Sequence, residues 1–148
     1  MTMTRWIWTT SPSTTRTTTT KLRRESVAVV AAAGKGTRLG AQVPKAYVSL
    51  GGRTLLERSV ATMSAVVDRV VVVVSPDMEA RARDILSRYN VELAHGGAER
   101  ADSILAALNT ISLTDGCVVV HDAARALTPP EMAHRVRVTV LGLSLIHI

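Results

Sequence analysis

Three short stretches of this 148-residue sequence hold residue types that phosphate and metal chemistry needs. The first, residues 31–40, reads Ala-Ala-Ala-Gly-Lys-Gly-Thr-Arg-Leu-Gly and is followed by Pro44-Lys45. The second, residues 96–103, reads Gly-Gly-Ala-Glu-Arg-Ala-Asp-Ser, and the third, residues 121–125, reads His-Asp-Ala-Ala-Arg. Glycines, cations and a carboxylate in such stretches predict a site for a phosphorylated ligand and a metal ion.

The first stretch is a glycine loop, whose backbone N–H groups could approach a polyphosphate without a side chain in the way. It is not a P-loop, because Gly36 rather than Ser or Thr follows Lys35. It is not a dinucleotide fingerprint either, because its glycine spacing differs and the second apolar run ends in Ser75 rather than in an acid. The loop does bring two further cations, Arg38 and Lys45. The structural alternative is a glycine-rich turn with solvated cations.

The other two stretches could supply a metal ligand and contacts to a base. Asp122 could ligate Mg²⁺ through one carboxylate, as expected of a metal held mainly by substrate phosphates, and Arg125 offers a planar fork to a phosphate. The structural alternative is a helix-capping Asp beside a surface Arg. In the second stretch, Ser103 and the glycines could contact a base or ribose, whereas Glu99 and Asp102 fit the first turn of a helix.

Apolar runs alternate with helix signals along the chain, which is the pattern of an α/β fold. Four runs are predicted as strands: residues 27–32, 69–75, 91–94 and 117–120. The second contains five consecutive valines, which is typical of a strand buried on both faces and predicts a mostly parallel sheet. In such sheets ligands lie outside the carboxyl ends of the strands, and all three stretches follow a strand.

Four helices are predicted between and after these strands. Thr54, Ser75 and Thr128 are predicted as N-caps of the first, second and fourth helices, because each precedes a helical apolar pattern. The third helix is predicted over residues 100–110, with three apolar side chains facing inward: Ile104, Leu105 and Leu108.

The composition excludes several classes of protein. With 47% hydrophobic and 20% charged residues the chain is globular, and it holds no run of eighteen apolar residues that could cross a membrane. The single cysteine, Cys117, excludes an internal disulfide and is predicted to be a core residue. His121 is predicted to pack at the end of its strand.

The positive charge is concentrated in the N-terminal segment. Residues 1–24 contain five basic residues and no acid, so residues 25–148 hold 13 basic and 12 acidic residues. A nearly neutral domain in which only 3% of the chain is aromatic lacks the charge and the stacking surfaces of a nucleic-acid binder. We therefore expect no nucleic-acid partner and no membrane association.

Together and in order, the three stretches resemble the 2-C-methyl-D-erythritol 4-phosphate cytidylyltransferase family over about residues 26–135. The resemblance implies an α/β, Rossmann-like nucleotide-diphospho-sugar transferase fold. It also implies transfer of CMP from CTP to 2-C-methyl-D-erythritol 4-phosphate with release of diphosphate, a step of non-mevalonate isoprenoid biosynthesis. Ribitol-5-phosphate cytidylyltransferases are close relatives that tend to carry valine at the position of Ala124, so the alanine favours the erythritol family.

The resemblance implies a role for each stretch. The backbone of the first would hold CTP through Ala32, Ala33, Gly34, Lys35 and Gly36, with Arg38 and Lys45 as catalytic cations on the phosphates. The second would contact the cytosine and ribose through Gly97, Ala98 and Ser103. The third would bind Mg²⁺ or another divalent cation through Asp122, with Ala123 and Arg125 also in the substrate site and Arg125 facing the sugar phosphate.

Family members continue well beyond the matched region, with a second metal-binding Asp, a late lysine and a β-arm that completes a homodimer. We therefore expect three segments: residues 1–24 as a disordered Thr-rich extension, 25–141 as a truncated nucleotidyltransferase domain that lacks the dimer arm, and 142–148 as a non-native tail. We expect this truncated chain itself to be catalytically inactive. The alternatives to the erythritol activity are a nucleotidyltransferase that acts on ribitol 5-phosphate or another sugar phosphate, and an inactive CTP-binding fragment. The expected location is the cytoplasm, or a plastid if residues 1–24 are a transit peptide.

Overall fold

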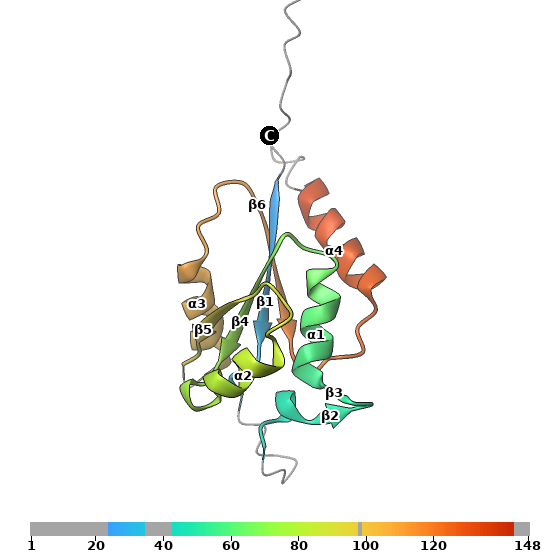
Figure 1. Ribbon diagram of the computed structural model, residues 1–148. Coiled ribbons are helices and arrows are strands. Elements are labelled where there is room, and N and C mark those ends of the chain that lie inside the picture. The colour runs from blue at the N-terminus through green and yellow to red at the C-terminus, as the bar shows by residue number, and fades with distance from the viewer. Residues whose placement is uncertain (1–23, 35–42, 98, 144–148) are drawn as a thin grey trace, which may run out of the picture.

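A four-stranded parallel sheet forms the centre of the protein in a computed structural model that describes residues 24–34, 43–97 and 99–143 (Figure 1). The strand order is β5-β4-β1-β6, and each neighbouring pair is parallel. The strands are β1 (Glu25–Ala31), β4 (Arg69–Val74), β5 (Glu92–His95) and β6 (Gly116–Asp122). The predicted α/β fold with a mostly parallel sheet is therefore confirmed.

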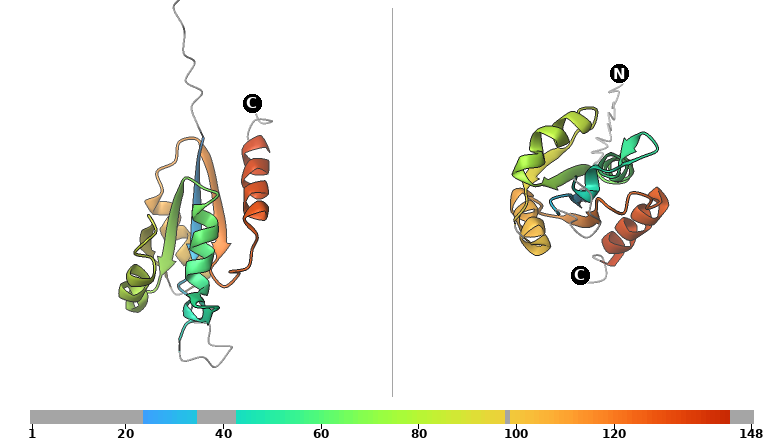
Figure 2. Two further views of the ribbon diagram at one scale, coloured as in Figure 1. Left: turned by 45° about the vertical axis from the view of Figure 1, so that its right-hand side comes forward. Right: turned by 90° about the horizontal axis from the view of Figure 1, so that it is seen from below.

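The two inner strands are buried on both faces. Successive side chains of a strand point to opposite faces, so β1 contributes Ala28 and Val30 to one core cluster and Val27 and Val29 to the other. The first cluster is covered by three helices: α1 (Leu55–Ser64), α2 (Glu79–Ile85) and α4 (Pro130–Leu143). The second is covered by α3 (Arg100–Thr110). The sheet thus lies between two helical layers (Figure 2).

The helix starts agree with the sequence only in part. The Thr54 hydroxyl oxygen accepts a hydrogen bond from the Glu57 N–H at 3.1 Å, so the predicted cap of α1 is confirmed. Ser75 makes no side-chain capping bond, and that prediction is wrong, because a 3-10 turn, η3 (Pro76–Met78), separates it from α2. The predicted cap of α4 by Thr128 is wrong as well, because α4 begins at Pro130 and the Thr128 hydroxyl donates to the Arg125 carbonyl of the preceding turn at 2.9 Å.

Helix α3 has the predicted bounds, and Ile104 is half-buried, but the prediction that Leu105 and Leu108 face inward is wrong. Ser103 and Ala107 are the buried residues, whereas Leu105 is 58% exposed and Leu108 is 40% exposed. The small residues let α3 approach the valines of β1 and β4 closely.

A short hairpin that the sequence analysis did not predict follows the 3-10 turn η2 (Lys45–Tyr47). Its strands are β2 (Ser49–Leu50) and β3 (Arg53–Thr54), joined by Gly51 and Gly52. Both glycines have positive φ, 58° and 77°, which a tight hairpin turn of this kind requires. The hairpin lies at the end of the sheet toward which the parallel strands point (Figure 1).

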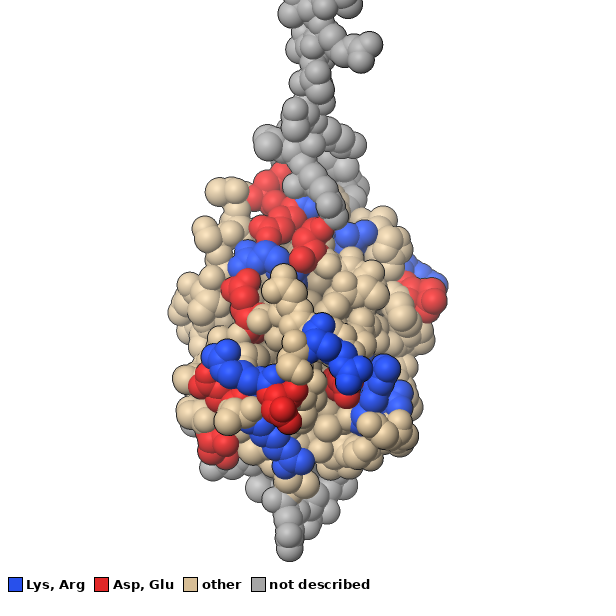
Figure 3. All heavy atoms as spheres, in the orientation of Figure 1, with Lys and Arg blue, Asp and Glu red and all other residues tan. Residues whose placement is uncertain are grey.

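Charged side chains of both signs are interspersed on the face seen in Figure 3. Within the described residues the Arg69 guanidinium donates to Glu92 Oε1 at 2.8 Å and to Glu25 Oε1 at 3.3 Å. These bonds raise the pKa of Arg69 above its ordinary value. Among the described residues, no helix is both long and apolar enough to cross a membrane. Of the predicted segments 1–24 and 142–148, residues 1–23 and 144–148 lie outside the described residues.

Candidate active site

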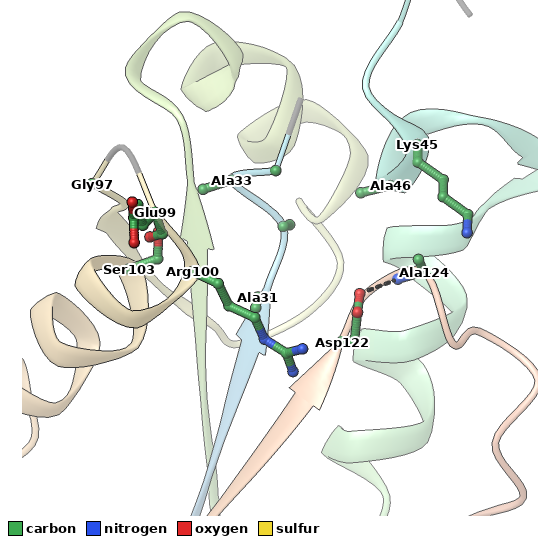
Figure 4. A pocket seen from close by; sticks show the side chains of 12 residues that line it. Ala31, Ala33, Lys45, Ala46, Gly97, Glu99, Arg100, Ser103, Asp122 and Ala124 are labelled. Carbon is green, nitrogen blue, oxygen red and sulfur yellow. Dashed lines mark hydrogen bonds between the residues drawn. The ribbon is translucent and has the colours of Figure 1, made fainter. Parts of the chain in front are cut away.

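An open cleft of about 270 Å³ lies where the strands end at their carboxyl side (Figure 4). It collects residues from the ends of β1 and β6, from the segment that leads into α3, and from η2. The lining residues are Ala31, Ala32, Ala33, Gly34, Lys45, Ala46, Gly97, Glu99, Arg100, Ser103, Asp122 and Ala124. The sheet therefore brings all three stretches of the sequence analysis to one place, as the parallel topology predicts.

The floor of the cleft is backbone with small side chains. Ala31 at the end of β1 is paired with Asp122 at the end of β6, and the ladder continues one residue further through the Ala123 N–H bonded to the Ala31 carbonyl at 3.1 Å. On the other side, the Ala32 N–H donates to the Val73 carbonyl at 2.8 Å. Beyond these bonds the chain leaves the sheet at Gly34, where an added Cβ would meet nothing within 4 Å. A ligand can therefore approach the main chain.

Asp122 is held by its own turn. Its Oδ1 accepts a hydrogen bond from the Ala124 N–H at 3.0 Å, and its backbone carbonyl accepts one from the Arg125 N–H at 2.9 Å. In the part of the chain that the structure describes, no donor is paired with Oδ2. That oxygen is open to a cation in the cleft.

The donor set fits a divalent metal that a substrate brings with it. The described residues contain no cluster of three or more His, Cys, Asp or Glu side chains that could hold a metal ion. Asp122 supplies one hard carboxylate ligand. Mg²⁺ is bound in this manner, by one or two carboxylates together with substrate phosphates and water.

Two cations reach the cleft from opposite sides. Lys45 comes from η2, a turn closed by the bond from the Tyr47 N–H to the Pro44 carbonyl at 2.9 Å, and it lies across the cleft from Arg100 (Figure 4). Arg100 comes from the first turn of α3 and extends toward Asp122 (Figure 4). Neither side chain has an ion pair within the described residues. Unpaired cations beside an open backbone are suited to phosphate oxygens.

The wall on the α3 side is shaped by two glycines and Ser103. A Cβ on Gly96 would lie 2.5 Å from the Ala33 Cβ and 2.6 Å from the Ser103 Oγ, so only glycine fits between them. A Cβ on Gly97 would lie 2.5 Å from the Asp102 Cβ. The Ser103 hydroxyl is buried and donates to the Glu99 carbonyl at 3.0 Å, which leaves its oxygen lone pairs to accept a bond from a ligand.

Asp102 belongs to the helix rather than to the cleft. Its Oδ2 accepts a hydrogen bond from the Glu99 N–H at 3.3 Å, so the predicted role in the first turn of the helix is confirmed. Glu99 has the N-cap position of α3 and also lines the cleft.

His121 and Cys117 are core residues of β6, as predicted. His121 is 8% exposed, and its burial lowers the pKa of the imidazole although the neighbouring Asp122 opposes the shift. Burial likewise raises the pKa of the Cys117 thiol. Both side chains are therefore held in their neutral forms, His121 beside the site and Cys117 at the opposite end of β6.

The structure brings together seven of the predicted site residues as lining of one cleft: Ala32, Ala33, Gly34, Lys45, Gly97, Ser103 and Asp122. It places Ala123 below the cleft, 1% exposed, and Arg125 on the surface, outside the lining. Four further predicted residues lie outside the described residues: Lys35, Gly36, Arg38 and Ala98.

Sequence reasoning missed several lining residues. The most important of them is Arg100, because its guanidinium is suited to binding a phosphate. A signal for it was present, because Arg100 precedes the predicted ligand contact Ser103 by three positions on a predicted helix. Residues at that spacing share one helix face. Ala31, Ala46, Ala124 and Glu99 also line the cleft, and only Glu99 carries a charge.

A parallel α/β sheet with this cleft at its carboxyl edge defines a Rossmann-like nucleotidyltransferase domain. A nucleotidyl transferase from a Methanothermobacter species superposes with a TM-score of 0.66 at 26% identity, covering 76% of this chain and 56% of that one. A 4-diphosphocytidyl-2C-methyl-D-erythritol synthase from Anaerococcus prevotii superposes with a TM-score of 0.69 at 26% identity, covering 80% of this chain and 51% of that one.

The sequence comparisons identify the family. The 2-C-methyl-D-erythritol 4-phosphate cytidylyltransferase profile matches residues 26–142, and the chain belongs to that family. The protein of this name from Corynebacterium efficiens is 54% identical over 121 residues, which cover 74% of this chain and 49% of the relative. The one from Rhodococcus jostii is 49% identical over 112 residues, again covering 49% of the relative. The chain thus spans about half the length of these relatives.

Proposed function

We propose that this chain is the nucleotide-binding part of a 2-C-methyl-D-erythritol 4-phosphate cytidylyltransferase, an enzyme that transfers CMP from CTP to 2-C-methyl-D-erythritol 4-phosphate and releases diphosphate. The observation that carries the proposal is the cleft itself. Backbone of the alanine-glycine loop, Lys45 and Asp122 lie around one volume, and the family match covers the segments that contribute them.

The proposed reaction is an in-line displacement at phosphorus. A phosphate oxygen of the acceptor forms a bond to the α-phosphorus of CTP, and the bond from that phosphorus to the bridging oxygen of diphosphate breaks. The protein needs no covalent nucleophile, because positioning and charge neutralisation supply the catalysis. Lys45 and Arg38 neutralise the charge that develops on the phosphate oxygens, while Lys35 and Gly36 continue the main chain that holds CTP.

The base and ribose are proposed to lie against the α3 wall. The Gly97 backbone, Ala98 and the Ser103 oxygen would contact the cytosine and its ribose. The main chain at Ala32, Ala33 and Gly34 would hold the nucleotide from below. Ser103 supports this role because its hydroxyl proton is already donated to Glu99, so its oxygen remains as an acceptor for an amino group of the base.

Asp122 is proposed to ligate Mg²⁺ or another divalent cation, with Ala123 fixing the turn beneath it. When bound, this ion would supply positive charge to the phosphate oxygens. Arg125 is proposed to face the phosphate of the acceptor from outside the nucleotide cleft. The relatives matched here are bacterial, which supports a cytoplasmic location and gives the plastid alternative no support. Homodimer formation is proposed from the family resemblance.

Nucleotide binding is tested on this chain directly. Titration calorimetry with CTP, ATP and cytidine, each with Mg²⁺, measures whether the triphosphate and the base both contribute to affinity. We expect CTP to bind more tightly than either of the others. Equal affinities for CTP and ATP would contradict the proposed base contacts.

Turnover is tested in a chimera. Residues 26–142 replace the matching segment of the Corynebacterium efficiens relative, and diphosphate release is measured with CTP, 2-C-methyl-D-erythritol 4-phosphate and Mg²⁺. We expect turnover that requires the acceptor. A folded chimera without acceptor-dependent release of diphosphate would overturn the proposed function.

A further inference from the structure

Ser59 is a buried serine in the middle of α1 that bonds to a residue far away in the sequence. Its side chain is 1% exposed, and its hydroxyl donates to the Ala123 carbonyl at 2.9 Å. A serine within a helix commonly donates to the carbonyl four residues earlier in the same helix. Ser59 instead connects α1 to the turn that follows β6.

The peptide group between Ala123 and Ala124 links this bond to Asp122. Its carbonyl accepts from Ser59, and its N–H, which belongs to Ala124, donates to Asp122 Oδ1 at 3.0 Å. A trans peptide is planar, with its carbonyl and N–H pointing in opposite directions, so a bond that fixes one orients the other. A hydrogen bond to the carbonyl also polarises the amide and strengthens its N–H as a donor.

We propose that Ser59 is a positioning residue for the Asp122 carboxylate, acting through the 123–124 peptide plane. The Ser59 hydroxyl fixes the orientation of this peptide group through its bond to the Ala123 carbonyl. The Ala124 N–H in turn fixes Asp122 Oδ1, so that Asp122 Oδ2 faces the cleft. Ser59 is not among the residues that line the cleft. Its effect on cation binding rests on the proposed function of Asp122, whereas its effect on the peptide plane does not.

Ser26 provides a matched control at the other end of the sheet. It is 0% exposed, and its hydroxyl donates to Asp68 Oδ2 at 2.7 Å, at the start of β1. Ser26→Ala and Ser59→Ala each remove one buried hydroxyl that donates a hydrogen bond, and Ser26→Ala also removes the bond that this hydroxyl accepts from the Asp68 N–H at 3.3 Å, so it is the more severe of the two changes. Only Ser59 is connected to Asp122, so a general loss of stability predicts similar effects of the two substitutions on the site, whereas positioning predicts an effect of Ser59→Ala alone.

The first measurement needs no ligand. Solvent exchange of the Ala124 amide proton, followed by NMR, reports on its bond to Asp122 Oδ1. We expect roughly tenfold faster exchange in Ser59→Ala and no change in Ser26→Ala. An unchanged Ala124 amide in folded Ser59→Ala would overturn the proposal. If the alanine variant does not fold, Ser59→Cys, which is nearly isosteric and a weaker donor, is expected to show the same change in smaller size.

The second measurement is the gain in CTP affinity that Mg²⁺ provides, taken as the ratio of dissociation constants in EDTA and in Mg²⁺. We expect Ser59→Ala to reduce this ratio roughly tenfold, as loss of a partner that orients a metal ligand does, and to leave the affinity in EDTA unchanged. Ser26→Ala should keep the wild-type ratio. The same ratio in Ser59→Ala and wild type would contradict the proposal. If the wild-type chain shows no gain from Mg²⁺, the proposed role of Asp122 fails, and the Ala124 amide alone decides the role of Ser59.

Discussion

The two ends of the central strand β1 differ in how their polar groups are satisfied. At the start of the strand, Ser26 and Asp68 exchange hydrogen bonds through both backbone and side chains, and Arg69 binds two glutamates. Arg24 donates to Asp115 at 3.3 Å. At the carboxyl end, Lys45 and Arg100 have no ion pair within the described residues. The charges there are arranged around an open cleft.

This contrast distinguishes charged residues that stabilise the fold from charged residues that are available to a ligand. A charged pair between protein groups satisfies both partners and is usually worth little on the surface. Lys45, Arg100 and the Asp122 carboxylate line the cleft without forming an ion pair with one another, so they remain available to a ligand that carries phosphates and a cation. A catalytic site commonly contains such locally unfavourable arrangements, and the remainder of the fold supports them. The comparison can be tested by removing charges from each end.

The largest expected effect is that of Lys45→Ala at the carboxyl end. If Lys45 neutralises charge that develops on the phosphates, its removal should lower kcat of the chimera by roughly 10²–10³-fold with a smaller change in KM, because the cation acts mainly on the transition state. Acceptor-dependent release of diphosphate measures this. Arg58→Ala, a cation on α1 that donates to the Leu50 carbonyl at 2.8 Å, is the control and should keep kcat. Wild-type kcat in Lys45→Ala would show that the unpaired lysine is incidental.

Arg100→Gln should have the next largest effect. Loss of a charge-assisted contact to a phosphate is expected to weaken CTP binding about tenfold while leaving cytidine binding unchanged, because cytidine has no phosphate. Calorimetric titration of the two ligands separates these cases. Arg88→Gln is the control, because Arg88 is an exposed cation outside the cleft lining that pairs with Glu57 at 3.9 Å. A parallel loss of cytidine affinity would mean that Arg100 shapes the α3 wall rather than binding a phosphate.

The parts of the fold that depend on local sequence signals could be predicted. Valine runs predict strands buried on both faces, and Thr54 predicts the start of α1, because these signals act within a few residues. The inward face of α3 was predicted wrongly, because that face depends on how closely the helix approaches the sheet. Ser103 and Ala107 pack there since β1 and β4 already fill the space with valines.

The site was predictable as a set of loops but not as a set of side chains. Parallel topology alone brings the three stretches to one edge of the sheet. The contribution of Arg100 depends on the rotation of α3, and the support of Asp122 by Ser59 depends on a contact between residues 64 positions apart. Neither feature has a local sequence signal strong enough to be predicted without the structure. Arg125, by contrast, belongs to the predicted stretch 121–125 and yet lies outside the lining of the cleft.

Arg69→Ala tests the paired end and should have a smaller effect. The Arg69 side chain is 32% exposed, and ion pairs of this kind contribute about 1 kcal/mol or less. We expect a decrease of that size in the free energy of unfolding, measured with urea, and an unchanged affinity for CTP. Salt should reduce the difference between variant and wild type. A loss of CTP affinity in Arg69→Ala would break the separation between the two ends.

Tyr47→Phe should have the smallest effect at neutral pH and a distinctive one in base. Tyr47 lies 2% exposed beside Lys45, and its hydroxyl has no hydrogen-bond partner among the described residues. Removing it therefore loses no bond, and the free energy of unfolding at pH 7 should stay the same or rise slightly.

Burial raises the pKa of Tyr47 to about 12, above the value near 10 of an unfolded chain. The neutral phenol is thus favoured in the folded state, and its contribution to stability is complete below pH 10 and is lost as the pH rises from about 10 to 12. Urea unfolding across that range should show a loss in the wild type that Tyr47→Phe lacks and that Tyr89→Phe keeps. An equal loss in Tyr47→Phe and wild type would mean that the phenol reaches water, and that the turn carrying Lys45 is less firmly packed than the comparison of the two ends requires.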